Sequence, residues 1–211
     1  DLKTSVNAAI ALAPEHISVY GLIVEEGTPF AAAEAAGQLA LPSEDAAEEM
    51  YDCLMEELPA HGYARYEISN FARAGYESRH NLGYWRNVPY LGIGAAAHGY
   101  IDGVRWGNEP DPERYIRAMQ TGRSVRTPED TERTRANAME EYSFLALRTR
   151  EGIDEADFRR TFGVGIDDVY GAVIGKYITQ GLLCRADGFV ALTNAGMKLG
   201  NEVFAAFLLG A

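Results

Sequence analysis

The stretch LKTSVNAAIALAPEHISVYGLIVE, residues 2–25, decides the fold class of this chain. In its first half, apolar residues recur at helical spacing until Pro14 stops the pattern. Its second half, residues 16–25, is a run of β-branched and aromatic residues, which is typical of a buried strand. A helix, a short turn and a strand in this order predict an α/β fold.

The alternation continues along the chain. Pro42-Ser43 precedes acidic residues and a helical pattern, which predicts a helix over about 44–60. A strand is expected over 63–68 and a possible short strand over 90–93, with a motif-rich loop between them. Asp102-Gly103 then indicates a hairpin or loop.

Composition changes near residue 121, where TGRSVRTPEDTERTRANA is polar and poor in large apolar residues. Such a segment is typical of a linker, so we divide the chain into domains 1–124 and 125–211. The second domain is expected to hold three helices, a hairpin and a last helix, resembling a winged helix. The expected helices are 138–148, 154–162, 166–180 and about 194–208, and the expected strands are 182–185 and 189–192.

Charge and cysteine content exclude several classes of protein. The formal net charge of −12 disfavours nucleic acid as a partner, and the predicted third helix offers only Lys176 against Asp167 and Asp168. Two distant cysteines form no disulfide framework, so a reducing cytoplasm fits best.

No apolar run approaches about 18 residues, so no integral membrane segment is expected. The start inside an element and without Met suggests a fragment.

Residues 66–85, YEISNFARAGYESRHNLGYW, form the densest run of aromatic, polar and glycine residues. His80, Asn81 and Tyr84 bring together an imidazole, an amide and a phenol, which could ligate or stack on a tetrapyrrole. The alternative is a buried polar cluster that satisfies backbone groups of the loop.

Small residues follow in YLGIGAAAHGY, residues 90–100. Gly92 and Gly94 could let the backbone approach a ligand closely, or they could allow tight packing of a strand against a helix. They do not form a dinucleotide fingerprint.

Other polar residues are weaker candidates. Glu25 and Glu67 lie on or just after expected strands and could meet a polar ligand, although a solvated loop is the alternative. His16 and His61 are expected to be caps or surface residues.

Five stretches follow one another along the chain and cover most of it: HISVYGLIVEEGTPF (16–30), GYARYEISNFARAGYESRHNLGYW (62–85), YLGIGAAAHGY (90–100), RWGN (105–108) and LRTREGID (147–154). Together they resemble the oxygen-independent coproporphyrinogen III oxidase family of radical-SAM proteins. The HNxxY and EISNFA motifs are most similar to the haem chaperone branch, HemW, rather than to the dehydrogenase branch, HemN.

The resemblance implies an α/β fold: the C-terminal part of an incomplete radical-SAM (β/α) barrel, followed by a small helical domain. It also implies S-adenosylmethionine and a [4Fe-4S] cluster in the full-length parent. Because the CxxxCxxC motif of the cluster is absent from this chain, we expect the fragment itself to be catalytically inert.

The resemblance assigns three groups of residues. It implies that His80, Asn81 and Tyr84 bind haem, with the imidazole as the axial metal ligand. It implies that Tyr20, Gly21 and Leu22 approach the adenine of S-adenosylmethionine. It places Gly92, Gly94 and His98 in a loop that closes on that cofactor.

The implied function is haem binding and haem transfer to acceptor proteins. One alternative is the oxidative decarboxylation of coproporphyrinogen III to protoporphyrinogen IX, and another is a non-catalytic module that binds a partner. A barrel cut after several strands would leave an open edge and an apolar face, so we also expect the fragment to self-associate as a homo-oligomer.

Overall fold

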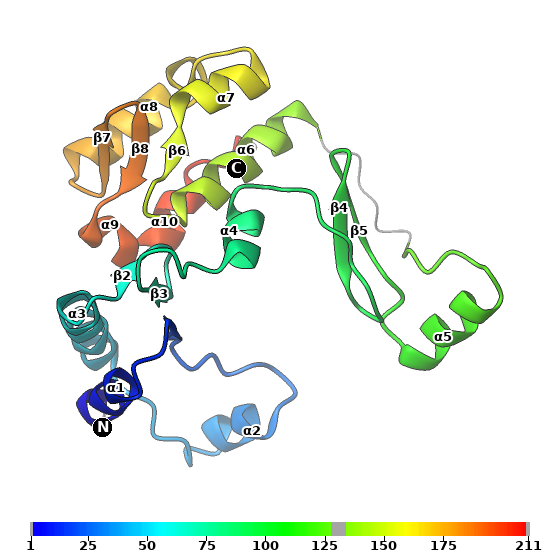
Figure 1. The fold of residues 1–211 in the computed structure, drawn as a ribbon, viewed down its shortest axis with the longest axis horizontal. Coiled ribbons are helices and arrows are strands. Elements are labelled where there is room, and N and C mark those ends of the chain that lie inside the picture. The colour runs from blue at the N-terminus through cyan, green and yellow to red at the C-terminus, as the bar shows by residue number, and fades with distance from the viewer. Residues whose placement is uncertain (1, 128–133, 210–211) are drawn as a thin grey trace. The chain divides into compact units, whose positions relative to one another are not determined.

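A computed structural model describes residues 2–127 and 134–209 in two compact units, 1–78 and 79–211 (Figure 1). Part of the predicted linker, residues 128–133, lies outside the described residues. The domain boundary at 124/125 stays a prediction.

Two helices form the core of the first unit, as predicted. Helix α1 (Leu2–Ala11) packs on helix α3 (Glu44–Ala60). The Ser43 hydroxyl accepts a hydrogen bond from the Ala46 amide at 3.2 Å and so caps α3. His61 is the C-cap of the same helix, which confirms its predicted role. The buried core consists of Val6, Leu54, Leu58, Tyr63 and Phe71.

The sheet of this unit is shorter than predicted. Strands β1 (His16–Ser18), β2 (Ala64–Arg65) and β3 (Asn70–Ala72) are antiparallel neighbours in the order β1-β3-β2. The strands expected over 16–25 and 63–68 therefore each form only in part. After Ser18, Tyr20, Leu22 and Ile23 are more than half exposed, and no described segment pairs with them. Strand propensity without a partner is insufficient, because a strand is stabilised by its neighbours. Helix α2 (Pro29–Ala35), capped by Thr28, was not predicted.

In the second unit, the segment expected as a loop contains a helix. Helix α4 (Arg79–Trp85) carries the HNxxY residues. The predicted hairpin is confirmed as β4 (His98–Ile101) and β5 (Val104–Gly107), joined at Asp102 and Gly103, which both have positive φ. The possible strand at 90–93 is reduced to a single bridge between Tyr90 and Tyr100. Helix α5 (Pro112–Gln120) was missed.

The remainder of the second unit contains the three predicted helices, α6 (Arg135–Leu147), α7 (Glu155–Phe162) and α8 (Ile166–Thr179). The predicted hairpin forms as β7 (Leu183–Ala186) and β8 (Phe189–Leu192). It is not a two-stranded wing, because β6 (Ile153–Asp154) pairs with β8 to give the order β6-β8-β7. The expected last helix is divided at Leu199 into α9 (Asn194–Lys198) and α10 (Gly200–Ala205).

The mixed α/β class is thus as predicted, whereas the barrel and the winged helix stay predictions. Within the described ranges, no helix is both long and apolar enough to cross a bilayer.

Candidate functional site

Helix α4 places His80 and Tyr84 on one face, because residues four apart are neighbours on a helix surface. Their ring centroids lie 4.7 Å apart in an edge-to-face arrangement at 75°. His80 is exposed, and among the described residues its imidazole has no hydrogen-bond partner. Asn81, the next residue on α4, is half-buried. The His80 ring is therefore held by an aromatic contact while its nitrogen atoms remain available to a ligand.

Three tyrosines of the second unit continue the aromatic contacts from His80. The Tyr84 ring meets the Tyr90 ring at 4.7 Å and 90°, and the Tyr90 and Tyr100 centroids lie 6.3 Å apart. The backbones of Tyr90 and Tyr100 exchange hydrogen bonds of 2.7 and 2.8 Å, which fixes this pair. We call His80, Tyr84, Tyr90 and Tyr100 the aromatic row. It joins α4 to β4 and presents an imidazole at its exposed end.

Arg105 on β5 lies at the other end of the aromatic row. Its guanidinium lies 5.2 Å from the centroid of the Tyr100 ring, and its Nη1 donates to the Tyr90 hydroxyl at 3.4 Å. Its Nη2 forms an ion pair with Glu141 on α6. One cationic side chain therefore contacts two rings of the row and a helix beyond it. Arg105 was not singled out as a site residue from the sequence, although it belongs to the RWGN stretch.

The glycine loop packs tightly against the hairpin. A Cβ atom on Gly92 would lie 2.3 Å from the His98 carbonyl oxygen, so no side chain fits there. The buried Asn108 side chain donates to the carbonyls of Gly92 at 3.1 Å and Gly94 at 3.0 Å. Gly92 thus allows close packing, but against strand β4 and not of a strand against a helix as the alternative expected, while a Cβ on Gly94 would meet nothing within 4 Å. His98 is exposed on β4. Sequence analysis missed the role of Asn108.

Tyr20, Gly21 and Leu22 belong to the first unit and line an apolar cavity of about 550 Å³. Helix α3 contributes Met50 and Leu54 to the lining, and β3 contributes Phe71. The structure therefore brings these three residues together at one cavity.

A buried polar network lies behind Tyr20. The Tyr20 hydroxyl accepts a hydrogen bond from Asn70 Nδ2 at 3.3 Å, and the same amide donates to Glu67. Glu67 is only 3% exposed and also accepts from the Ser69 amide at 2.9 Å. The solvated-loop alternative is therefore wrong for Glu67, whereas Glu25 is exposed. Sequence analysis did not single out Asn70.

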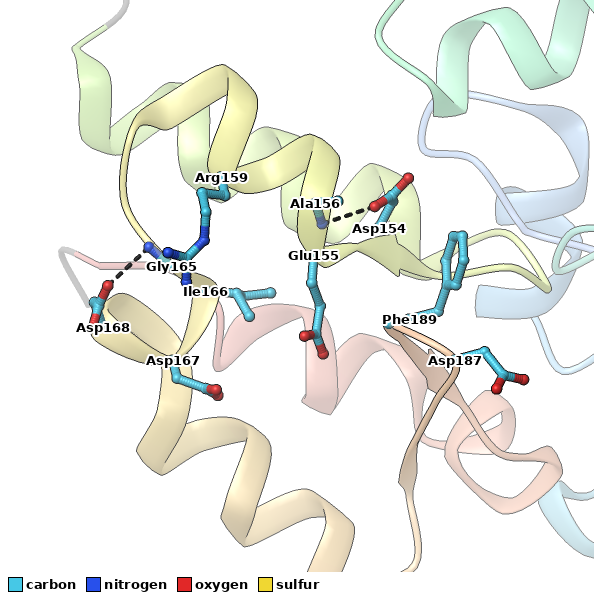
Figure 2. Close-up of a pocket in the computed structure, with 11 residues that line it drawn as sticks. Asp154, Glu155, Ala156, Arg159, Gly165, Ile166, Asp167, Asp168, Asp187 and Phe189 are labelled. Atoms are coloured by element: carbon cyan, nitrogen blue, oxygen red, sulfur yellow. Dashed lines mark hydrogen bonds between the residues drawn. The ribbon is translucent and has the colours of Figure 1, made fainter.

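An acidic cavity of about 720 Å³ lies between α7, α8 and the β7–β8 turn (Figure 2). Four of its five acidic side chains, all except Asp187, have structural partners among the described residues. Asp154 accepts from the Ala156 amide at 2.9 Å and Asp168 from the Gly165 amide at 2.8 Å, both capping helices. Glu155 and Asp167 pair with Arg185, each at 2.6 Å. These contacts account for the acids as stabilising groups of the helical fold.

The described residues contain no group of three or more His, Cys, Asp or Glu side chains arranged to hold a metal ion. Haem needs fewer protein ligands than a bare metal ion does. The porphyrin supplies four ligands to the iron, and one imidazole can complete the site. The exposed His80 meets that requirement.

Known proteins are similar to this chain in sequence and in fold. Residues 134–199 match the HemN C-terminal domain family. The fold is similar to the solved structure of coproporphyrinogen III oxidase (HemN) from Escherichia coli, a radical SAM enzyme, with a TM-score of 0.72 and 16% identity. That match covers 99% of this chain and 51% of the other. The fold is therefore similar to that of about half of the HemN structure.

The sequence identity of the chain to proteins named HemW is higher than its identity to the HemN structure. The chain is 42% identical over 208 residues to "Heme chaperone HemW" of Bacillus subtilis, covering 98% of this chain and 54% of that protein. It is 36% identical to "Heme chaperone HemW" of Lactococcus lactis, covering 99% and 54%. The chain therefore matches the HemN C-terminal domain over residues 134–199 and is similar to HemW over nearly all of its own length. It spans about half the length of these curated relatives.

Proposed function

We propose that this chain binds haem through His80 and is the haem-binding part of a HemW-like protein that transfers haem to acceptor proteins. The observation that carries the proposal is an exposed imidazole without a hydrogen-bond partner among the described residues, held edge-on against Tyr84. The relatives named heme chaperone support it.

His80 would supply a neutral ring nitrogen to the iron, the usual role of imidazole in haem proteins. The contact with Tyr84 limits the rotation of the imidazole, and the Asn81 amide could hydrogen-bond a haem carboxylate. Because His80 is exposed, a haem held by it would be accessible to an acceptor protein. Such a site is suited to carrying haem and releasing it.

We assign S-adenosylmethionine and a [4Fe-4S] cluster to the whole protein rather than to this chain alone. Cys53 and Cys184 are far apart in the sequence and cannot form the three-cysteine motif of the cluster. The cavity lined by Tyr20, Gly21 and Leu22 is the part of this chain that could contact the adenine. Gly92, Gly94 and His98 keep their proposed place in the loop that closes on the cofactor.

Haem titration of the chain tests the role of His80. We expect wild type to show a red-shifted Soret band at one equivalent of haem and His80→Ala to lose it. His61→Ala is the matched control, because His61 is also exposed but its Nδ1 contacts the Glu57 carbonyl in the other unit. Equal spectra and affinities for wild type and His80→Ala would contradict the proposal.

A second candidate function is the oxidative decarboxylation of coproporphyrinogen III, which the fold similarity to HemN favours. The higher identity to proteins named heme chaperone favours haem transfer instead. An anaerobic assay of the whole protein distinguishes the two functions: formation of protoporphyrinogen IX would favour the enzyme.

A further inference from the structure

Arg105 connects the aromatic row to the helical part of the second unit. Glu141 lies on α6, within the segment that matches the HemN C-terminal domain. Its side chain is only 14% exposed, so removal of the Arg105 guanidinium would take an ion-pair partner from a largely buried carboxylate. From Glu141 the contacts run through Arg105 to the Tyr90 hydroxyl and the Tyr100 ring, and from Tyr90 to Tyr84 and His80.

The chemistry of arginine explains how one residue can make all of these contacts. A guanidinium is planar and carries five N–H donors, so it can face a ring while donating to a hydroxyl and a carboxylate. Lysine carries a point charge without that plane and could keep only part of the set. The arrangement therefore depends on Arg105 and on the charge of Glu141 that orients it.

We infer that Arg105 is a positioning residue for the haem site and that Glu141 sets its orientation, so that the C-terminal domain controls the haem affinity of His80. This inference rests on the proposed function, because it concerns the same site.

A second ion pair in the same unit provides a matched control. Arg86, directly after α4, pairs with Glu151 at 3.0 Å, and the two side chains are 54% and 65% exposed. An exposed pair of this kind contributes little, and no described contact links it to the aromatic row. Its removal should leave haem binding nearly unchanged.

The test measures haem affinity, Soret position and thermal unfolding for Arg105→Met, Arg105→Lys, Glu141→Gln, Tyr90→Phe and Arg86→Gln. We expect Arg105→Met and Glu141→Gln to weaken haem binding roughly tenfold and to shift the Soret band, since each disrupts charged hydrogen bonds. Arg105→Lys should recover part of the loss. Arg86→Gln should change affinity by less than about twofold.

A double-mutant cycle separates positioning from general destabilisation. If Arg105 acts through the Tyr90 hydroxyl, Tyr90→Phe combined with Arg105→Met should weaken binding little more than Arg105→Met alone. Additive losses, or unchanged affinity and spectrum in folded Arg105→Met and Glu141→Gln, would overturn the inference. Loss of the Soret band in His80→Ala with no effect at Arg105 would overturn this inference alone. No effect at His80 would overturn the proposed function.

Discussion

Tyr170 on α8 is almost completely buried, with 1% of its surface exposed, and this burial raises its pKa to about 12. Burial and a hydrogen bond to Asp157 raise the pKa of Tyr142 as well. An unfolded tyrosine titrates near pH 10, so above that pH the unfolded chain loses protons that the folded chain keeps. The stabilisation is therefore complete below about pH 10 and falls as pH rises towards the folded pKa.

We predict that the free energy of unfolding decreases between about pH 10 and pH 12, with Tyr170 contributing a slope of up to about 1.4 kcal/mol per pH unit. Urea unfolding across this range measures the effect. Tyr170→Phe should reduce the slope, whereas Tyr76→Phe, at a residue 57% exposed, should not. The same slope in Tyr170→Phe and wild type would show that another group is responsible.

At the scale of single residues, sequence analysis identified His80 and Tyr84 because motif residues four apart are visible in any sequence. It did not identify Arg105, Asn70 or Asn108, whose roles depend on partners far away in the chain. Arg105 and Glu141 are 36 residues apart. Long-range pairs of this kind have no local pattern.

At the element scale, the pairing of β6 with β8 depends on Gly152, which directly precedes β6. Gly152 has φ +80, and a Cβ there would lie 2.2 Å from the Val190 carbonyl oxygen. Gly188, in the β7–β8 turn, has nearly the same φ of +82 but no atom within 4 Å of its Cβ position. A substitution at Gly188 therefore tests backbone strain alone, whereas a substitution at Gly152 tests strain together with a steric clash.

We predict that Gly152→Ala lowers the free energy of unfolding by at least about 3 kcal/mol, because strain and a backbone clash combine. Gly188→Ala should cost about 1–2 kcal/mol, from the positive φ alone. Urea unfolding of both variants provides the measurement. Equal costs would mean that the approach of Gly152 to β8 is not a close contact in solution.

Helices were better predicted than strands in this chain. Helices such as α3 and α8 carry their own periodicity and caps, so their bounds are visible in the sequence. The strand expected over 16–25 has suitable residues but pairs only over His16–Ser18, since pairing depends on a distant segment. Strand β6, which joins the β7–β8 hairpin in a three-stranded sheet, is only two residues long. It is too short to show the alternation of apolar and polar residues that marks a strand.

At the scale of the whole molecule, the complete aromatic row, Arg105 and Glu141 all belong to the second unit. That unit has a buried core of its own, which includes Phe158, Tyr170 and Val190. We predict that residues 79–211 fold alone and bind haem with the affinity of the whole chain. Residues 1–78 should not bind haem, and neither should residues 125–211, which lack His80.

Circular dichroism and haem titration of the three fragments measure this outcome. A folded 79–211 fragment that fails to bind haem would show that the first unit contributes to the site. Binding by 125–211 would place the haem ligand in the C-terminal domain instead.

The most direct test of the central claim is chemical rescue of His80. In His80→Gly the imidazole is removed, so added free imidazole should restore the Soret band and the iron–histidine type of ligation seen by resonance Raman spectroscopy. We predict that His80→Gly loses the wild-type spectrum and recovers it with imidazole, while His61→Gly needs no rescue. A His80→Gly protein with the wild-type spectrum before imidazole is added would contradict the assignment of His80 as the haem ligand.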